Sequence, residues 1–185
     1  MNACLNFTYN VAGGYIEGYK MAADALIEGI HENRGRGIDF LVFPVCFLYR
    51  HYIEIQLKEL IHTFGLLHDK PEAKEYLSKP RHSLKDLWQK FKEMNVELDQ
   101  IDPDDLQRMN EIIVELDAFD PGGTTFRYHK DIKSGKISLR HRDNDRPTTY
   151  CNLDALYEEM QILHSWLDAG EAYFKDQLQM KWDMT

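Results

Sequence analysis

Hydrophobic side chains recur every three or four positions through most of this chain, which is the spacing that gathers them on one face of an α-helix. On this pattern we predict five helices, over 11–31, over 44–64, from Ser83, from Pro103 and over 153–180. The helix over 44–64 is apolar around most of its circumference. Because such a helix must be buried on more than one side, we expect it at the centre of a bundle.

Residues at the helix ends support these boundaries. Pro44 suits the first turn of a helix, since its missing N–H has no helical partner there. Ser83 is followed three residues later by Asp86, which resembles a capping box, and Asn152 can cap the last helix with its side-chain oxygen. The polar segment 68–82 is interpreted as a connection with room for one short helical turn.

The periodicity changes after the sequence DPGG at 120–123, which ends the fourth helix. From Thr125 onward the residues alternate between apolar and polar, and a Lys-Ser-Gly-Lys stretch at 133–136 divides them into two runs. This pattern predicts a two-stranded β-hairpin over 125–142. The predicted fold class is mainly α, with a single domain over 1–185: an up-and-down bundle of about five helices with a small β-hairpin inserted before the long C-terminal helix.

Length and composition exclude several classes of protein. A chain of 185 residues can bury a sizeable core in one domain. It has no run of about 18 apolar residues, so no membrane span is expected, and its first residues lack the basic and apolar regions of a secretory signal. The three cysteines, Cys4, Cys46 and Cys151, are far apart in the sequence and form no CxxC pair. We therefore expect neither a disulfide framework nor a zinc site, and a cytoplasmic location.

The chain contains no familiar cofactor motif. Neither a GxxxxGK[ST] loop, a GxGxxG loop nor an HExxH sequence occurs. The eight histidines are scattered, and none of them pairs with another at the spacing of a helical metal site. We expect no cofactor and no metal.

The formal charge of −9 is unevenly distributed along the chain. Between Thr125 and Arg146 there are seven Lys or Arg residues and three Asp residues, a net charge of +4 that leaves −13 for the rest. An acidic body repels polyanions, but one basic segment on it can contact RNA, DNA or an acidic protein. The alternative is a Lys-rich hairpin that is merely solvated. The predicted contact residues are Lys130, Lys133, Lys136, Arg140 and Arg142.

Two short motifs follow one another in the predicted bundle. The helix over 44–64 has a Glu-x-x-Leu-Lys core, and a His-x-Leu-x-x-Leu segment opens the next helix. The residues concerned are Glu54, Leu57, Lys58 and Ile61, then His82, Leu84 and Leu87. This order resembles the HEPN superfamily, small helical bundles of bacterial and archaeal conflict systems. The likeness extends from about Tyr15 to Phe174. It implies a helical homodimer that is either a metal-independent RNase or a binding and assembly module.

The RNases of that family carry an Arg and, after four to six intervening residues, a His on one helix. A neutral His can remove the 2′-hydroxyl proton, while Arg stabilises the charge that grows on the phosphate. No arginine of this chain is followed by His at that spacing. The resemblance therefore implies a binding and assembly module of a bacterial defence or toxin–antitoxin-like system, contacting nucleic acid or a partner protein.

Two other functions stay open. One is a metal-independent RNase with a rearranged Arg/His site. The other is an acidic antitoxin-like protein that masks a basic partner. An RNase would cleave RNA in EDTA, whereas an antitoxin-like partner would bind no nucleic acid and would co-purify with a basic chain.

Polar residues of the central helix supply one part of a candidate site. Arg50 and His51 are adjacent but about 100° apart around the helix. Glu54 follows Arg50 by one turn, so the two side chains can pair. For Glu54, Lys58 and His82 we predict a structural or interface role.

The start of the predicted hairpin supplies the other part. Arg127, Tyr128 and His129 together could contact a phosphate and stack on a base, although Tyr128 would face the other side of a strand. If the hairpin folds back over the central helix, a composite RNase site becomes possible. Its catalytic residues would be Arg50, His51, Arg127 and His129.

Overall fold

The computed structural model describes residues 11–95, 101–120, 122–127 and 150–184. All regular secondary structure within these ranges is helical, which confirms the mainly α fold class. The helices are α1 (Val11–Glu32), α2 (Ile38–Leu67), α3 (Pro71–Leu77), α4 (Leu84–Met94), α5 (Pro103–Phe119) and α6 (Leu153–Asp183). Helix α3 occupies the segment for which only a short helical turn was expected. The other five helices correspond to the five predicted ones.

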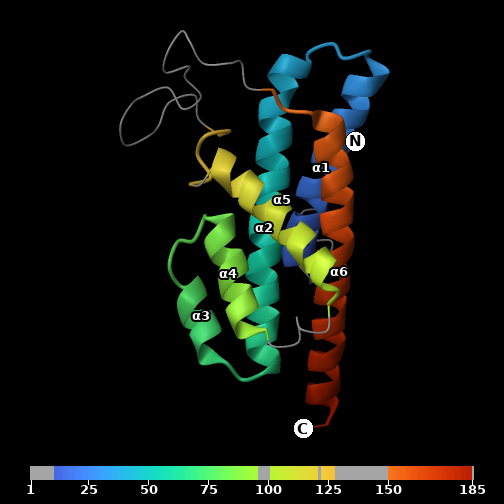
Figure 1. Cartoon of the computed structure of the whole chain (residues 1–185). Helices are drawn as coiled ribbons and strands as arrows, with labels where there is room; N and C mark the ends of the chain where they lie inside the picture. The colour runs from blue at the N-terminus through green and yellow to red at the C-terminus, as the bar shows by residue number, and fades with distance from the viewer. Residues whose placement is uncertain (1–10, 96–100, 121, 128–149, 185) are drawn as a thin grey trace.

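Helix α2 lies at the centre of the bundle, as its broad apolar surface predicted. It contacts α1, α3, α4 and α6 (Figure 1). The long helices α1, α2 and α6 lie alongside one another, while α5 crosses the bundle obliquely (Figure 1). The shorter α3 and α4 lie against the C-terminal half of α2. The bundle is therefore less regular than the up-and-down arrangement that the sequence suggested.

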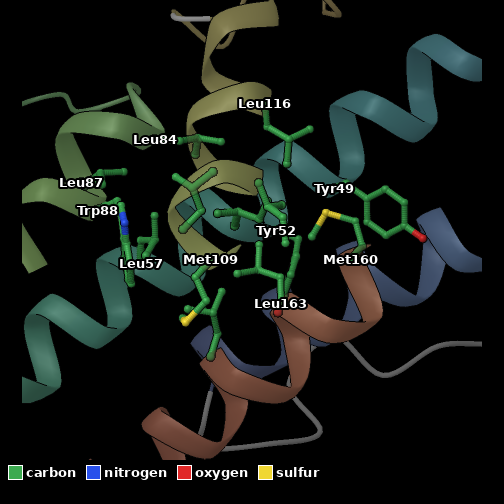
Figure 2. Close-up of a cluster of buried hydrophobic side chains, with 14 of the residues drawn as sticks. Tyr49, Tyr52, Leu57, Leu84, Leu87, Trp88, Met109, Leu116, Met160 and Leu163 are labelled. Atoms are coloured by element: carbon green, nitrogen blue, oxygen red, sulfur yellow. The ribbon is translucent and has the colours of Figure 1, made fainter. Parts of the chain in front are cut away.

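The core lies where α2, α4, α5 and α6 meet. Figure 2 shows large side chains from all four helices converging there. The labelled residues are Tyr49, Tyr52, Leu57, Leu84, Leu87, Trp88, Met109, Leu116, Met160 and Leu163. Each of these side chains is at most 8% exposed. Burial of a large apolar side chain contributes about 1.5–3 kcal/mol, so this cluster accounts for much of the stability of the bundle.

The predicted helix caps at Ser83 and Asn152 are confirmed. The Ser83 hydroxyl accepts a hydrogen bond from the Asp86 N–H at 3.1 Å. The Asn152 side-chain oxygen accepts from the N–H groups of Asp154 and Ala155 at 3.1 and 3.2 Å. These bonds satisfy backbone donors that the first turn of a helix leaves free.

Helix α2 begins earlier and ends later than the sequence suggested. It starts after Gly37, whose φ of 82° lies in the left-handed region, so Pro44 falls inside the helix rather than in its first turn. Proline at this interior position removes one backbone hydrogen bond and crowds the preceding turn, which weakens the first turns of the helix. The helix also continues through Gly65, where the predicted stop lies. Gly65 is required for close packing, because a Cβ at this position would clash with the Cβ of Ala73 in α3.

The predicted β-hairpin over 125–142 is not supported. Its described residues, 125–127, form a turn instead of a strand, and the rest of the predicted hairpin lies outside the described residues. The turn has a local cause. The Asp120 carboxylate accepts hydrogen bonds from the backbone N–H groups of Thr124 and Thr125, and the Arg127 N–H donates to the Thr124 carbonyl at 3.3 Å. A side chain that binds its own loop in this way bends the backbone and competes with strand pairing.

In the part of the chain that the structure describes, every helix is too short or too polar to cross a membrane.

Candidate functional site

The Arg50 side chain is buried at the junction of three segments. Its Nε donates to the Asp120 carbonyl oxygen at 2.9 Å, its Nη1 donates to Glu54 Oε2 at 3.0 Å, and its Nη2 donates to the His82 carbonyl oxygen. Arg50 is 2% exposed. The guanidinium group thus joins α2 to the end of α5 and to the residue before the cap of α4. All three nitrogen atoms of the group therefore donate to acceptors inside the fold.

Glu54 connects this arginine to Lys58 and His82, the other two polar residues of the two short motifs. Its Oε1 accepts hydrogen bonds from Lys58 Nζ at 2.6 Å and from His82 Nδ1 at 3.1 Å. Burial alone would raise the pKa of the Glu54 carboxyl group, but the bonds from Lys58 and His82 hold that pKa below its ordinary value. The carboxylate is therefore kept ionised beside Arg50. Glu54, Lys58 and His82 form one hydrogen-bonded cluster, and the structural or interface role predicted for them stays a prediction.

Asp120 closes the far side of the Arg50 site. This residue is fully buried, and its Oδ1 accepts from the N–H groups of Thr124 and Thr125 at 2.8 and 2.9 Å. Its Oδ2 lies 3.5 Å from Arg50 Nε and accepts no hydrogen bond from the residues that the structure describes. The loop reaches Arg50 closely at Gly123, which has φ of 67°, and a Cβ there would lie 2.9 Å from Arg50 Nη1. Asp120 and Gly123 are structural parts of this cluster that the sequence marked only as a helix end.

A second acid of α5 fixes the segment that carries His82. Asp117 Oδ1 accepts from the backbone N–H of Leu84 at 2.6 Å, and Oδ2 accepts from the Ser83 hydroxyl at 3.3 Å. Asp117 is 7% exposed. The two acids, Asp117 and Asp120, thus place the start of α4 and the Arg50 site relative to each other. The helical spacing of apolar residues in α5 gave no sign of this role.

His51 faces a different surface from Arg50. Its ring packs edge-on against Tyr19 at 4.5 Å and stacks with Phe47 at 5.6 Å between ring centres. Burial lowers the pKa of the His51 imidazole, and the positive charges of Arg127, Lys58 and Arg50 add to that effect. The ring is therefore neutral at pH 7, and its buried Nδ1 has no hydrogen-bond partner within the described part of the chain.

Arg127 packs against Phe47, the residue whose ring stacks with His51. Its guanidinium carbon lies 5.1 Å from the centre of the Phe47 ring. Tyr15 extends the row at the other end, stacked with Tyr19 at 6.3 Å between ring centres. Tyr15, Tyr19, His51, Phe47 and Arg127 form a continuous row, which we call the aromatic strip.

The structure therefore divides the four residues of the hypothetical RNase site. His51 and Arg127 both contact Phe47, whereas the Arg50 guanidinium is held inside by three acceptors. His129 lies outside the described residues, as do the predicted contact residues Lys130, Lys133, Lys136, Arg140 and Arg142. Among the described residues, no group of three or more His, Cys, Asp or Glu side chains could hold a metal ion.

No family model, curated protein or solved structure matches this chain. The likeness to HEPN proteins stays a prediction from short motifs.

The lowered pKa of Glu54 predicts acid sensitivity. A carboxyl group with a lowered folded-state pKa contributes stability above its unfolded pKa, and this contribution is lost as the pH falls through the folded value. We expect the urea midpoint of the wild type to fall between pH 5 and pH 3 more steeply than that of Glu54→Gln. The variant should be less stable at pH 7, because it weakens the bonds to Arg50 and Lys58. Urea unfolding at a series of pH values measures both effects.

Glu159→Gln is the matched control for this prediction. Glu159 pairs with Arg108 on the surface, where both side chains are more than one third exposed. The urea midpoint of the Glu159→Gln variant should change with pH in the same way as that of the wild type. Equal slopes for Glu54→Gln and the wild type would show that Glu54 does not carry the acid sensitivity.

Proposed function

We propose that this protein is a HEPN-like helical module that binds single-stranded nucleic acid without cleaving it. The observation that carries this proposal is the aromatic strip, which ends at Arg127. Every side chain in it is exposed or partly exposed. The exposed faces of Tyr15 and Tyr19 suit stacking with bases, which contributes about 1–3 kcal/mol per base, and the guanidinium group suits a phosphate.

The charge distribution supports the same surface. Arg127 is followed directly in sequence by the Lys- and Arg-rich residues 128–146, while the rest of the chain is acidic. A polyanion would be repelled elsewhere and attracted to this end of the strip. A ligand with both flat apolar groups and negative charges satisfies both features, and single-stranded RNA is the ligand of this kind that the HEPN resemblance favours.

The buried position of Arg50 argues against the alternative RNase function. An arginine that stabilises phosphate charge must reach the substrate, and Arg50 donates to three acceptors inside the fold. Moving it would leave Asp120 without its cation and Glu54 with Lys58 as its remaining cation, which is strongly unfavourable in a buried site. We therefore assign Arg50 to the structure of the bundle.

The cellular setting follows from the resemblance alone. On that basis we propose a cytoplasmic bacterial protein that forms a homodimer and assembles with a partner protein in a defence or toxin–antitoxin-like system. A fold-level likeness carries such a setting only by analogy.

RNA binding is tested by fluorescence anisotropy in EDTA with a labelled single-stranded RNA of about 20 nucleotides, long enough to cover one binding surface. We expect affinity to fall with salt. Arg127→Gln should reduce the salt slope by about 0.7, the amount for one phosphate contact on a single strand. Tyr15→Ala should weaken binding roughly tenfold through lost stacking.

Two matched controls separate the strip from general surface effects. Arg108→Gln removes an exposed arginine of α5, and Tyr173→Ala removes a half-exposed tyrosine of α6. Both should bind RNA like the wild type. Equal losses in the controls, or no salt-dependent binding at all, would contradict the proposal. Absence of binding together with a co-purifying basic protein would favour the antitoxin-like alternative.

A further inference from the structure

His82 is held through both its backbone and its side chain by buried charged residues. Its carbonyl oxygen accepts a hydrogen bond from Arg50 Nη2, and its ring Nδ1 lies 3.1 Å from Glu54 Oε1. The segment that follows is fixed as well, because the Leu84 N–H donates to the Asp117 carboxylate at 2.6 Å. Although His82 lies in a connection before α4, these bonds set the position of its backbone and the direction of its ring.

The same contacts decide which ring nitrogen is free to react. Glu54 is buried and its carboxylate is ionised, so this group can only accept hydrogen bonds. The His82 Nδ1 must then carry the proton, and in the neutral imidazole the second nitrogen, Nε2, keeps its lone pair. The His82 side chain is 50% exposed, and its Nε2 makes no hydrogen bond to any residue that the structure describes. A carboxylate that orients a histidine in this way leaves Nε2 as the nucleophilic atom.

A cation lies beside this imidazole. Lys58 Nζ donates to Glu54 Oε1 at 2.6 Å, so it shares one oxygen with the Nδ1 of His82. The Lys58 side chain is partly exposed, and its ammonium group can therefore also contact a group bound at the ring. An ammonium group stabilises the oxygens of a phosphate, whereas it offers nothing comparable to an uncharged acyl or alkyl group. The charge next to the nucleophile thus favours a phosphoryl group.

We propose that His82 is a phosphoryl-acceptor site, in which Nε2 takes a phosphoryl group from an activated donor while Glu54 orients the ring and Lys58 binds the phosphate. The donor is a small molecule with a reactive bond from phosphorus to nitrogen or to an acyl oxygen. A half-exposed ring can be reached by such a donor without any movement of the fold. Glu54 is a positioning residue, because it acts on the donor only through the ring. The proposal does not depend on nucleic-acid binding, which concerns the aromatic strip.

The transfer is a displacement at phosphorus and needs no oxidant or reductant. With phosphoramidate as the donor, the Nε2 lone pair attacks phosphorus; a bond from phosphorus to the ring forms, the bond from phosphorus to the amino nitrogen breaks, and ammonia leaves. The ring gains one positive charge, which the Glu54 carboxylate stabilises through the Nδ1 proton that it already binds. The phosphoryl oxygens keep a charge of about −2, as in other protein phosphates, and this charge lies next to the Lys58 ammonium group.

The proposal is tested by incubating the full chain with phosphoramidate at neutral pH. Phosphorus NMR and peptide mapping at alkaline pH, where phosphohistidine survives, then identify the residue and the ring nitrogen. We expect His82 to react first and on Nε2. His31 is the control within the same chain, because it is also exposed but bonds an exposed carboxylate, that of Asp154, through Nε2 at 2.9 Å. The rate at His82 should exceed that at His31 roughly a hundredfold, the lower end of the gain from a positioned acid–base partner.

Two variants separate this mechanism from simple exposure. His82→Gln should lose the fast reaction and keep the slow labelling of His31. Glu54→Gln keeps the shape of the side chain but removes its charge; in the folded variant, His82 should react no faster than His31 and on either ring nitrogen. The wild-type comparison with His31 does not depend on how well that variant folds. Equal rates at His82 and His31 in the wild type, phosphate on Nδ1 of His82, or an unchanged rate in Glu54→Gln would overturn the proposal.

Discussion

Replacing Arg50 by alanine is expected to lower the free energy of unfolding by about 3–5 kcal/mol, the range for breaking a buried ion pair from one side. The variant keeps Glu54 and Asp120 buried but removes the cation between them. It also removes the Arg50 donor to the His82 carbonyl oxygen and one of two donors to the Asp120 carbonyl oxygen, which still accepts from the Gly123 N–H at 3.1 Å. Each of these losses affects a different segment, so α4 and the end of α5 should loosen from α2 together.

Urea unfolding followed by circular dichroism measures this effect. Arg108→Ala is the matched control, because Arg108 pairs with Glu159 on the surface at 2.9 Å. Exposed pairs contribute little, so the control should unfold at nearly the wild-type midpoint. Arg50→Ala with a midpoint as high as the control would contradict the structural role of Arg50 and return it to the list of candidate catalytic residues.

Replacing Trp88 by alanine is expected to cost about 3–5 kcal/mol, as for other buried aromatic residues. The Trp88 side chain is 1% exposed, packs against Phe91 at 5.8 Å between ring centres, and donates from Nε1 to Asn110 at 3.2 Å. Its loss leaves a cavity between α4 and α5 and removes one of the two donors to Asn110 Oδ1, which still accepts from Lys92 Nζ at 3.0 Å. Helix α4 is short, so it has few other contacts with which to compensate.

Trp182→Ala is the control for this prediction. Trp182 lies near the end of α6 and is 58% exposed, so its removal should change stability by no more than about 0.5 kcal/mol. Both variants are compared by urea unfolding. Similar midpoints for Trp88→Ala and Trp182→Ala would show that Trp88 is not the core residue that the fold requires.

Most of the bundle could be predicted from the sequence because local patterns determine it. The three-and-four spacing of apolar residues predicted α1, α2, α4, α5 and α6, and the side chains of Ser83 and Asn152 predicted two helix caps. The central place of α2 followed from its broad apolar surface. Helix boundaries were less accurate. Pro44 lies inside α2 because Gly37 starts the helix earlier, and Gly65 permits contact with α3 instead of stopping the helix.

The candidate site could be predicted only in part. Glu54 was expected to pair with Arg50 because the two are one turn apart, and the structure confirms this pair. The contacts of Arg50 with Asp120 and His82 join positions 70 and 32 residues away, and no local pattern encodes such distances. The hairpin prediction was wrong at its first residues. The alternation of apolar and polar positions does not indicate the hydrogen bonds that the Asp120 side chain accepts from its own loop.

The most direct test of binding without cleavage is one incubation of excess wild-type protein with labelled single-stranded RNA in EDTA. Half of the sample is read for bound RNA on a native gel, and half for intact RNA on a denaturing gel. We predict that the RNA is bound and stays intact, and that Arg127→Gln binds less of it. RNA cleaved by the wild type and spared by a folded His51→Ala variant would contradict this account and identify a rearranged RNase site.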